Sequence, residues 1–267
     1  METNKIYHMD CIQGMKEKVL DNSIDMILTS PPYDNLRFYG NKNKKELENS
    51  WNFEVFKKVA KECTRVLKDG GVIIWVVGDA TIKGSETGTS FKQALYFKEE
   101  CGLNLYDTMI YQKQNYIPLT HKRYEQCFEY MFVFTKGKPK TFNPILIETK
   151  NTGKKINRNS SKTKEQSVRG REETTTIKDF KIKNNIWQYV IGSNKIKTKH
   201  PAVFPFQLAT DHILSWTNEN DIVLDPFAGG GTTIFSSTTH NRNFIGFEIE
   251  EKYYNEMIFN LKVIKND

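Results

Sequence analysis

The stretch Leu28–Asn35, LTSPPYDN, contains residues whose types suggest chemistry. A short apolar run, Ile24–Leu28, is typical of a buried strand, and the two prolines after Ser30 end it abruptly because proline has no backbone N–H. An aromatic ring, Tyr33, follows at once. Taken alone, this pattern most often marks a strand end with a stiff turn. The alternative is a site that holds a flat group beside a carbonyl, and other parts of the chain must decide between the two.

A second candidate site is the glycine-rich segment Val223–Thr233, VLDPFAGGGTT. Its turn lets a ligand approach the backbone and presents free amides at the start of an expected helix. No Gly-Lys-Ser/Thr follows, which excludes a Walker phosphate loop. The next apolar strand ends in Glu248, 17 residues after Gly231, where an acidic side chain is placed to accept hydrogen bonds from ribose hydroxyls. The other role open to Glu248 is a favourable charge at a helix N-terminus.

The elements that position these residues follow from hydrophobic periodicity. Strands are expected at Lys5–Met9, Ile24–Thr29, Val72–Val77, Leu105–Gln112, Phe128–Thr135, Ile222–Asp225 and Phe244–Phe247. Helices are expected at Phe53–Leu67, Ser90–Glu100, Phe204–Trp216, Thr232–His240 and Glu251–Leu261. The alternation predicts an α/β fold with a mostly parallel sheet covered on both faces. Two successive strands without a helix between them predict an antiparallel hairpin at one edge.

The middle of the chain, residues 136–198, has a different composition. Between Thr135 and His200 there are 17 Lys and Arg against 5 Asp and Glu, so the remaining residues carry a net charge of −5. Residues 151–176 are polar and typical of an exposed, mobile loop, and apolar residues return at Asn185–Ile191. We interpret the region as a small subdomain inserted into the α/β frame. Its charge favours a polyanion, most often nucleic acid, over a merely solvated insertion.

The bulk properties exclude several classes of protein. The 267 residues suffice for one α/β domain with an insertion, and no apolar run approaches the length of a membrane span. The N-terminus lacks a signal-peptide pattern. The four cysteines show no metal-binding spacing, so free thiols in a reducing cytoplasm and no metal are expected.

Taken together, the motifs resemble those of the amino-group DNA methyltransferases of the permuted β group. SPPY matches their catalytic motif and DPFAGGGTT their cofactor motif, with Gly230 where a serine is common. KHPAVFP, Lys199–Pro205, and MDCIQGM, Met9–Met15, match two further segments. The order of the motifs, with the basic insertion between SPPY and the glycine turn, also matches. The resemblance covers Met1–Lys136 and Asn185–Asp267.

The resemblance implies a Rossmann-like S-adenosylmethionine-dependent methyltransferase fold plus a small target-recognition region. Residues 1–135 are then the catalytic part, 136–198 the recognition insertion and 199–267 the cofactor-binding part. S-adenosylmethionine is the implied cofactor, with S-adenosylhomocysteine as its product. The residues implied to bind it are Asp10, Cys11, Ser30, Lys199, His200, Phe204, Asp225, Pro226, Phe227, Gly229, Gly231, Thr232, Thr233 and Glu248. His200 has a packed or capping role as its alternative.

The implied reaction uses Ser30, Pro31, Pro32 and Tyr33. The Ser30 hydroxyl and the Pro31 carbonyl are placed to accept both hydrogens of an exocyclic amine, while Tyr33 stacks on a base flipped out of the duplex. Serine before the prolines resembles the cytosine-N4 pattern, and adenine-N6 is the alternative. Cytosine-C5 methylation requires a cysteine nucleophile, usually after a proline, and no cysteine here follows one. RNA or protein-amide methylation and a non-catalytic DNA-binding module are weaker alternatives.

Double-stranded DNA is the expected partner, in restriction–modification or epigenetic marking within a bacterial cytoplasm and at the nucleoid. The resemblance also allows a homodimer and a companion restriction endonuclease. The candidate DNA contacts are basic residues of the insertion. They are Lys154, Lys155, Arg158, Arg169, Arg171, Lys195 and Lys197.

Overall fold

The computed structural model describes residues 1–32, 51–116, 122–158, 173–192, 198, 200 and 204–266. They divide into two compact units: unit 1 comprises Met1–Asn143 and Asn185–Asp267, and unit 2 comprises Pro144–Asn184. None of the helices in these residues is long and apolar enough to cross a membrane.

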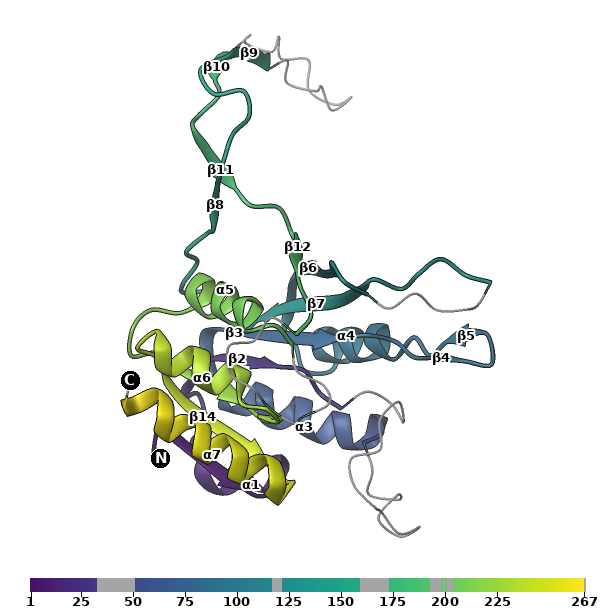
Figure 1. The fold of residues 1–267 in the computed structure, drawn as a ribbon, viewed down its shortest axis with the longest axis vertical. Coiled ribbons are helices and arrows are strands. Elements are labelled where there is room, and N and C mark those ends of the chain that lie inside the picture. Colours follow the sequence, from purple (N-terminus) through teal and green to yellow (C-terminus); the bar gives the residue numbers. More distant parts are fainter. Residues whose placement is uncertain are drawn as a thin grey trace. The chain divides into compact units, whose positions relative to one another are not determined.

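Unit 1 is built on an eight-stranded sheet with the order β1-β14-β13-β2-β3-β7-β6-β12 (Figure 1). Its strands are β1 Lys5–His8, β2 Ile24–Thr29, β3 Leu67–Val77, β6 Asn104–Lys113, β7 Phe128–Thr135, β12 Ile186–Tyr189, β13 Ile222–Asp225 and β14 Asn243–Glu248. β7 pairs antiparallel with both β3 and β6, and the other pairs are parallel. The predicted α/β fold with a mostly parallel sheet and an antiparallel hairpin is therefore confirmed.

The outermost position beyond the hairpin belongs to β12, which the sequence analysis placed in the insertion. Ile186–Tyr189 pairs in parallel register with Ile110–Lys113 of β6. Trp187 and Tyr189 are buried, while the alternate residues Ile186 and Gln188 are exposed. This alternation with period two means that one face of β12 packs against the rest of unit 1 and the other face is exposed. The compact unit within the predicted insertion of residues 136–198 comprises residues 144–184.

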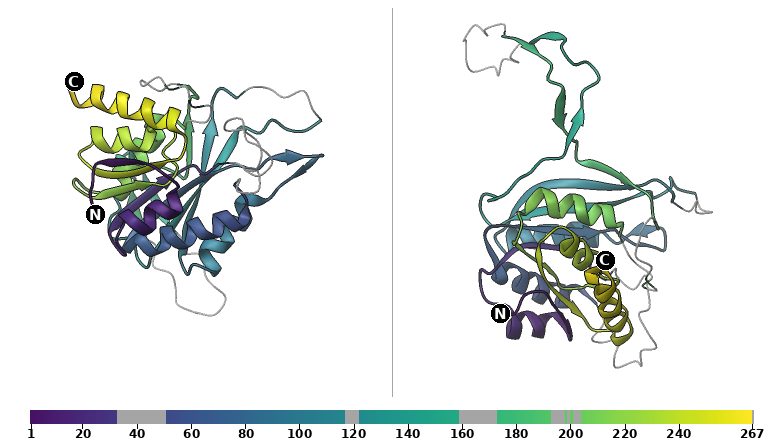
Figure 2. Two further views of the ribbon diagram at one scale, coloured as in Figure 1. Left: turned by 90° about the horizontal axis from the view of Figure 1, so that it is seen from below. Right: turned by 60° about the vertical axis from the view of Figure 1, so that its left-hand side comes forward.

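Helices cover both faces of the sheet (Figure 2). On one face α3 contacts both α1 and α4, and on the opposite face α6 contacts both α5 and α7. Their bounds are α1 Cys11–Lys18, α3 Phe53–Val66, α4 Thr89–Glu99, α5 Phe206–Trp216, α6 Thr232–Thr239 and α7 Glu251–Asn266. A short hairpin, β4 Thr81–Ile82 with β5 Ser85–Glu86, follows β3. α1 was not predicted, because Gly14 and several polar residues obscure its period.

The main core lies between the sheet and the layer of α1, α3 and α4. α3 places buried side chains at spacings of three and four residues, and its first turn is capped by the Asn52 side chain, which accepts hydrogen bonds from Glu54 N and Val55 N. Phe56, Trp75 and Phe97 pack edge to face with centroid separations of 5.2–5.7 Å. The Trp75 indole N–H also donates to Gln93 Oε1 at 2.8 Å, so a buried hydrogen bond fixes the orientation of this ring within the apolar core.

Unit 2 consists of two antiparallel ribbons. β8 Leu146–Glu148 pairs with β11 Phe180–Ile182, and β9 Lys155–Arg158 pairs with β10 Glu173–Thr176. The residues of β8 and β11 are all exposed. The predicted loop at residues 151–176 therefore contains paired strands on both sides of residues 159–172, which lie outside the described residues. Backbone pairing, rather than burial, holds the β8–β11 ribbon together, and this explains why hydrophobic periodicity gave no signal there.

Candidate active site

The predicted site residues that the structure describes lie at the carboxyl ends of the parallel strands, which we call the sheet edge. β2 ends at Thr29, β13 at Asp225 and β14 at Glu248, and β14 lies in register with β1, where His8 is opposite Glu248. The chain proceeds from β13 to β14 on one side and from β2 to β3 on the other, so the strand order reverses between β13 and β2. In open α/β sheets, ligands bind outside the carboxyl ends of the strands at such a point.

The glycine turn after β13 depends on two left-handed backbone conformations. Gly229 has φ +50° and Gly231 has φ +83°. A Cβ atom at Gly231 would lie 2.6 Å from the Phe235 ring and would collide with it, and one at Gly229 would lie 3.1 Å from His200 Nε2, so that the His200 ring would have to shift. α6 then begins at Thr232 without a side-chain cap, and its first amides lie at the sheet edge.

Glu248 is joined to this turn by its side chain. Its Oε2 accepts a hydrogen bond from Gly229 N at 2.7 Å, and its Oε1 accepts one from Glu250 N at 2.8 Å. The side chain is buried, with the residue 8% exposed. Burial raises the pKa of Glu248, and the two backbone N–H groups offset part of that shift. The carboxylate therefore fixes the turn while standing at the tip of the second strand of a βαβ unit.

Asp225 forms the other polar centre of the edge. Its Oδ1 accepts hydrogen bonds from Thr29 Oγ1 at 2.6 Å and from Phe227 N at 3.0 Å. Burial raises the pKa of Asp225 to about 6, although the hydroxyls of Thr29 and Thr233 and the Phe227 amide each lower it. Pro226 is buried beside it. The ring of Phe227 packs edge to face on Trp51, with centroids 5.2 Å apart.

The SPP segment begins where β2 ends. Ser30 directly follows Thr29, which is fully buried, and Pro31 is buried while Pro32 is partly exposed. The strand neighbouring β2 on one side is β13, which leads into the glycine turn, and on the other side it is β3. The structure thus brings Ser30 and Pro31 to the same sheet edge as Asp225. Tyr33 lies outside the described residues.

Asp10 and Cys11 open α1 at the same edge. The Asp10 side chain caps this helix by accepting hydrogen bonds from Ile12 N at 2.9 Å and Gln13 N at 3.0 Å. Cys11 is buried at 7% exposure, and burial raises the pKa of its thiol well above the ordinary value. A neutral, buried thiol is a poor nucleophile. This agrees with the absence of a Pro-Cys pair.

His200 stands beside the glycine turn, and Phe204 lies shortly before α5. The His200 ring packs edge to face on Tyr253 of α7, with centroids 4.5 Å apart, and its backbone N–H donates to Thr198 Oγ1 at 3.1 Å. The proximity of this ring to Gly229 places the predicted segment next to the predicted turn. Phe204 is partly buried. Lys199 lies outside the described residues.

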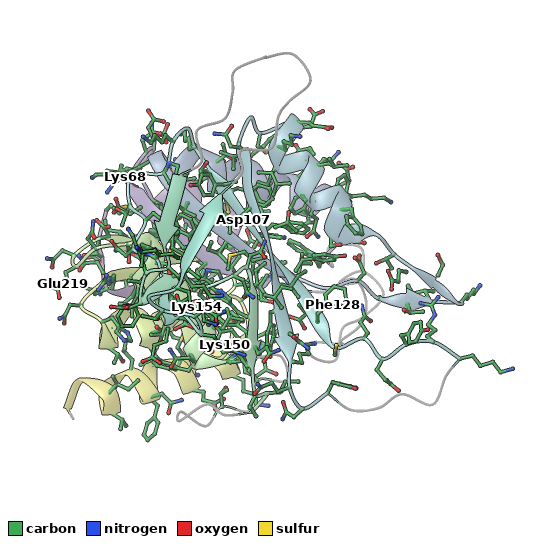
Figure 3. All side chains as sticks on the ribbon, turned by 90° about the horizontal axis from the view of Figure 1, so that it is seen from above. Lys68, Asp107, Phe128, Lys150, Lys154 and Glu219 are labelled. Atoms are coloured by element: carbon green, nitrogen blue, oxygen red, sulfur yellow. The ribbon has the colours of Figure 1, made fainter. Side chains whose placement is uncertain are left out.

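The candidate DNA contacts are only partly described. Lys154 and Lys155 are exposed in unit 2, where Lys154 Nζ donates to Asn151 Oδ1 at 3.0 Å, and the Lys154 side chain is labelled in Figure 3. The backbone of Arg158 belongs to β9, but its side chain lies outside the described residues. The remaining four also lie outside them: Arg169, Arg171, Lys195 and Lys197.

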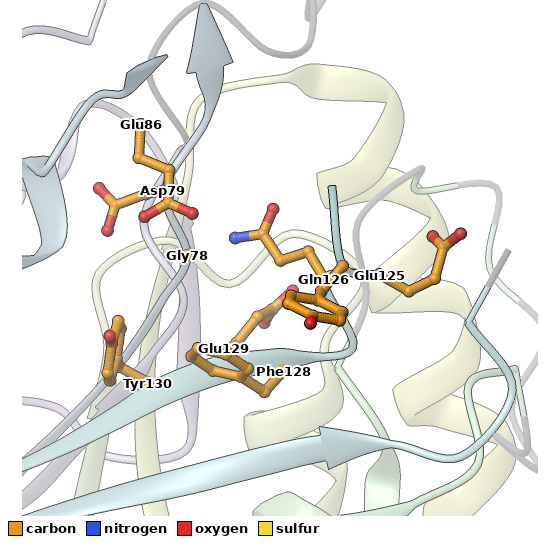
Figure 4. Close-up of a pocket in the computed structure, with 9 residues that line it drawn as sticks. Gly78, Asp79, Glu86, Glu125, Gln126, Phe128, Glu129 and Tyr130 are labelled. Atoms are coloured by element: carbon orange, nitrogen blue, oxygen red, sulfur yellow. The ribbon is translucent and has the colours of Figure 1, made fainter. Parts of the chain in front are cut away.

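A pocket that the sequence did not predict lies at the carboxyl end of β3. It encloses about 190 Å³ between Gly78 and Asp79, the hairpin residue Glu86 and the start of β7 (Figure 4). Its carboxylates are engaged with the protein: Asp79 accepts a hydrogen bond from Ser90 N at 3.0 Å, and Glu129 pairs with Lys113 at 2.6 Å. Within the described residues, no group of three or more His, Cys, Asp or Glu is arranged to hold a metal ion.

Comparison with known proteins agrees with this geometry. A family model described as DNA methylase, N6_N4_Mtase, matches residues 24–260. The orphan methyltransferase M.BamHII of Bacillus amyloliquefaciens is 49% identical over 248 residues, which cover 90% of this chain and 89% of that protein. The type II methyltransferase M.BglII of Bacillus subtilis is 29% identical over 257 residues, covering 94% of this chain and 66% of that protein.

Two solved structures share the fold. The PvuII DNA methyltransferase, described as cytosine-N4-specific, has a TM-score of 0.73 and 19% identity, covering 100% of this chain and 91% of that one. The complex of M1.HpyAVI with SAM has a TM-score of 0.63 and 25% identity, covering 96% and 98%. With the family model matching most of its length, the chain belongs to the N6 and N4 DNA methylase family and is a DNA amino-methyltransferase.

Proposed function

We propose that this enzyme transfers the methyl group of S-adenosylmethionine to the exocyclic N4 amine of a cytosine flipped out of duplex DNA. The observation that carries the proposal is the adjacency of two strand ends. Ser30 and Pro31 follow β2, and the glycine turn follows its parallel neighbour β13. A group held by the turn and a base held by Ser30 would meet at this edge.

The residues around the turn fit S-adenosylmethionine. The two left-handed glycines keep the backbone surface clear of side chains. Glu248 is positioned to accept hydrogen bonds from the ribose hydroxyls, Asp10 and Cys11 to meet the adenine edge, and Phe227 to pack on the adenine ring. The cofactor supplies an electrophilic methyl group on a sulfonium. His200 borders the same turn, and His200 and Phe204 are proposed to flank the methionine end.

The amine that must react is a weak nucleophile, since its lone pair is delocalised into the ring. In the proposed arrangement the Ser30 hydroxyl oxygen and the Pro31 carbonyl oxygen each accept one amine hydrogen. Two acceptors in fixed positions draw the nitrogen toward tetrahedral geometry and direct its lone pair at the methyl group. Proline fixes φ, so the carbonyl is oriented before the base arrives. Transfer is then direct, without a covalent intermediate on the enzyme: the bond from nitrogen to the methyl carbon forms as the bond from that carbon to sulfur breaks. S-adenosylhomocysteine leaves, and the methylated amine loses one of its hydrogens as a proton to solvent.

The target amine is paired inside the duplex, so the base must leave the stack at a cost of a few kcal/mol. Tyr33 is proposed to stack on the flipped base and to return about 1–3 kcal/mol. The choice of cytosine rests on serine at position 30, because aspartate or asparagine there resembles the adenine-N6 pattern. Adenine-N6 is accordingly the second candidate.

Duplex DNA is the proposed partner, and unit 2 is the proposed recognition region. The described part of unit 2 exposes Lys154 and Lys155, which are suited to phosphate contacts. The setting we propose is restriction–modification or epigenetic marking in a bacterial cytoplasm. Co-purification and light scattering test for a companion restriction endonuclease and a homodimer.

The reaction is tested by incubating the enzyme with unmethylated genomic DNA and isotopically labelled S-adenosylmethionine, followed by digestion to nucleosides and mass analysis. We expect 4-methylcytosine. Labelled 6-methyladenine would replace the lead proposal by the second candidate. Label in RNA or protein but not in DNA would overturn both.

The role of Ser30 is tested with Ser30→Ala, which we expect to lower the single-turnover transfer rate by about 100-fold, as for loss of one positioned hydrogen-bonding group in a transition state. Binding of S-adenosylmethionine should change little. Ser23→Ala is the matched control, since Ser23 precedes the opposite end of β2 and donates to Leu20 O at 2.7 Å. Equal losses of transfer rate and cofactor affinity in Ser30→Ala would contradict the assigned role.

A further inference from the structure

Thr29, the last residue of β2, connects the two strand ends of the active site. Its Oγ1 donates a hydrogen bond of 2.6 Å to Asp225 Oδ1, between residues 196 positions apart. Thr29 is 0% exposed and Asp225 is 2% exposed. The same Asp225 oxygen accepts a hydrogen bond from Phe227 N at 3.0 Å, inside the segment that leads to the glycine turn.

A second hydrogen bond joins the same two parts of the site. Thr233 Oγ1, in the first turn of α6, donates to the carbonyl oxygen of Leu28 at 3.2 Å. Thr233 is also fully buried. The last two residues of β2 are therefore bonded both to the strand before the glycine turn and to the helix after it.

These side-chain bonds extend the contact between β2 and β13 beyond their backbone ladder. Ladder pairing joins Val223 to Met26 and Leu224 to Ile27, two or more residues short of Ser30. Past that point the Thr29–Asp225 bond joins the strands. Burial of a carboxylate in this interface is unfavourable in itself, and apolar side chains would pack the interface without that cost. A hydrogen bond between a hydroxyl and a carboxylate is directional, so this pair fixes the relative position of the two strand ends more narrowly than apolar packing would.

We propose that Thr29 is a positioning residue of the methyl transfer. Through Asp225 it sets the separation between the amine acceptors at Ser30 and Pro31 and the glycine turn that holds the methyl donor. This inference rests on the proposed roles of Ser30 and of the turn. Thr29 itself touches neither substrate nor cofactor in this account. Its contribution is to the distance and angle at which the amine meets the methyl group, which transfer rates sense steeply.

The test is a graded series at position 29. Thr29→Ser keeps the hydroxyl donor, Thr29→Cys substitutes a weak donor, and Thr29→Val keeps the shape but has no donor. The control is Thr135→Val. Thr135 is likewise a fully buried threonine at the last residue of a strand, and it donates to Gly137 O at 2.8 Å. It pairs with Val72, away from the end of β3 that lies near Ser30, so its loss leaves the site untouched.

Three quantities are measured for each variant: the single-turnover transfer rate to duplex DNA at saturating S-adenosylmethionine, the Kd for S-adenosylmethionine, and the melting temperature. We expect Thr29→Val to lower the transfer rate by on the order of 10- to 100-fold. Its cofactor Kd should stay within about threefold of wild type and its melting temperature near that of Thr135→Val. Thr29→Ser should restore the rate to within about threefold, with Thr29→Cys between them.

A transfer rate of Thr29→Val within about twofold of wild type would overturn the proposal. A loss of cofactor affinity as large as the loss of rate would overturn it too, because the residue would then act on binding. If Thr29→Val is insoluble, equal rates for Thr29→Ser and Thr29→Cys decide against the proposal. Failure of the proposed function is distinguishable: the wild-type enzyme would then transfer no methyl group to a DNA amine.

Discussion

Units 1 and 2 differ in how their strands are held in place. In unit 1 the central strands β2, β3, β13 and β14 are largely buried, and the site residues stand at the carboxyl ends of β2, β13 and β14, so a core fixes the position of each functional side chain. In unit 2 the strands form short ribbons, the side chains of β8 and β11 are exposed, and backbone pairing such as Thr149 N to Asp179 O at 2.8 Å holds the strands together. Because of this difference, we expect substitutions that disturb the backbone to cost more stability in unit 1, whereas unit 2 should tolerate replacement of its surface residues.

Substitution of a left-handed glycine should have a much larger effect in unit 1 than in unit 2. Gly231 in unit 1 has φ +83° and no room for a Cβ, whereas Gly153 in unit 2 has φ +77° and nothing within 4 Å of an added Cβ. We expect Gly231→Ala to lower the free energy of unfolding by about 3 kcal/mol or more, from backbone strain and collision with Phe235. Gly153→Ala carries the strain alone, about 1 kcal/mol and confined to unit 2.

Urea unfolding followed by tryptophan fluorescence separates these two effects, since all four tryptophans (Trp51, Trp75, Trp187 and Trp216) belong to unit 1. The midpoint should fall strongly for Gly231→Ala and stay at the wild-type value for Gly153→Ala. Equal shifts in the two variants would contradict the separation of the units in stability.

Removal of residues 151–176 is the second test. It takes away the β9–β10 ribbon and leaves the β8–β11 pairing of unit 2 in place. Because the deleted segment holds seven Lys and Arg against three Asp and Glu, we expect DNA affinity at about 150 mM salt to fall by on the order of 100-fold. The Kd for S-adenosylmethionine, measured by calorimetry, should stay within about threefold because the glycine turn is in unit 1.

A milder variant of the same experiment replaces Lys154 and Lys155 by Gln, which should reduce the salt slope of DNA binding by about 2. Lys16→Gln with Lys18→Gln in α1 is the matched control for charge, and its salt slope should equal that of wild type. A deletion that leaves DNA affinity intact would move the recognition role to another surface.

The structure was most predictable where it depends on residues that are close together in the sequence. The SPP segment and the glycine turn carry their own geometry through proline and glycine, and the buried strands appear as apolar runs, so the sheet edge was predictable. α1 was missed because Gly14 and polar residues interrupt its period, although Gly14 is required there: a Cβ would lie 2.3 Å from the Phe247 ring. The unit 2 ribbons and the Thr29–Asp225 bond depend on pairing between distant residues, which periodicity along the chain does not encode.

The smallest expected effect concerns the pH dependence of stability set by Asp225. Burial raises its pKa to about 6 in the folded protein, above the ordinary value of 3.8. The folded state therefore holds this proton more tightly than the unfolded state does, so stability from protonation is present below about pH 4 and is lost as pH rises through 6. Relative to Asp225→Asn, the wild type should gain about 1 kcal/mol of unfolding free energy between pH 7.5 and pH 5.

The measurement is urea unfolding of both proteins at several pH values without cofactor, with the difference in free energy plotted against pH. Asp179→Asn, which removes an exposed carboxylate from unit 2, controls for the loss of one negative charge. Because the Thr29 hydroxyl lowers the pKa of Asp225, Thr29→Val should shift the pH-dependent rise in stability to higher pH. Parallel curves for wild type and Asp225→Asn would show that the buried carboxyl keeps the same protonation throughout, and the strand ends would then be joined by a permanently charged group.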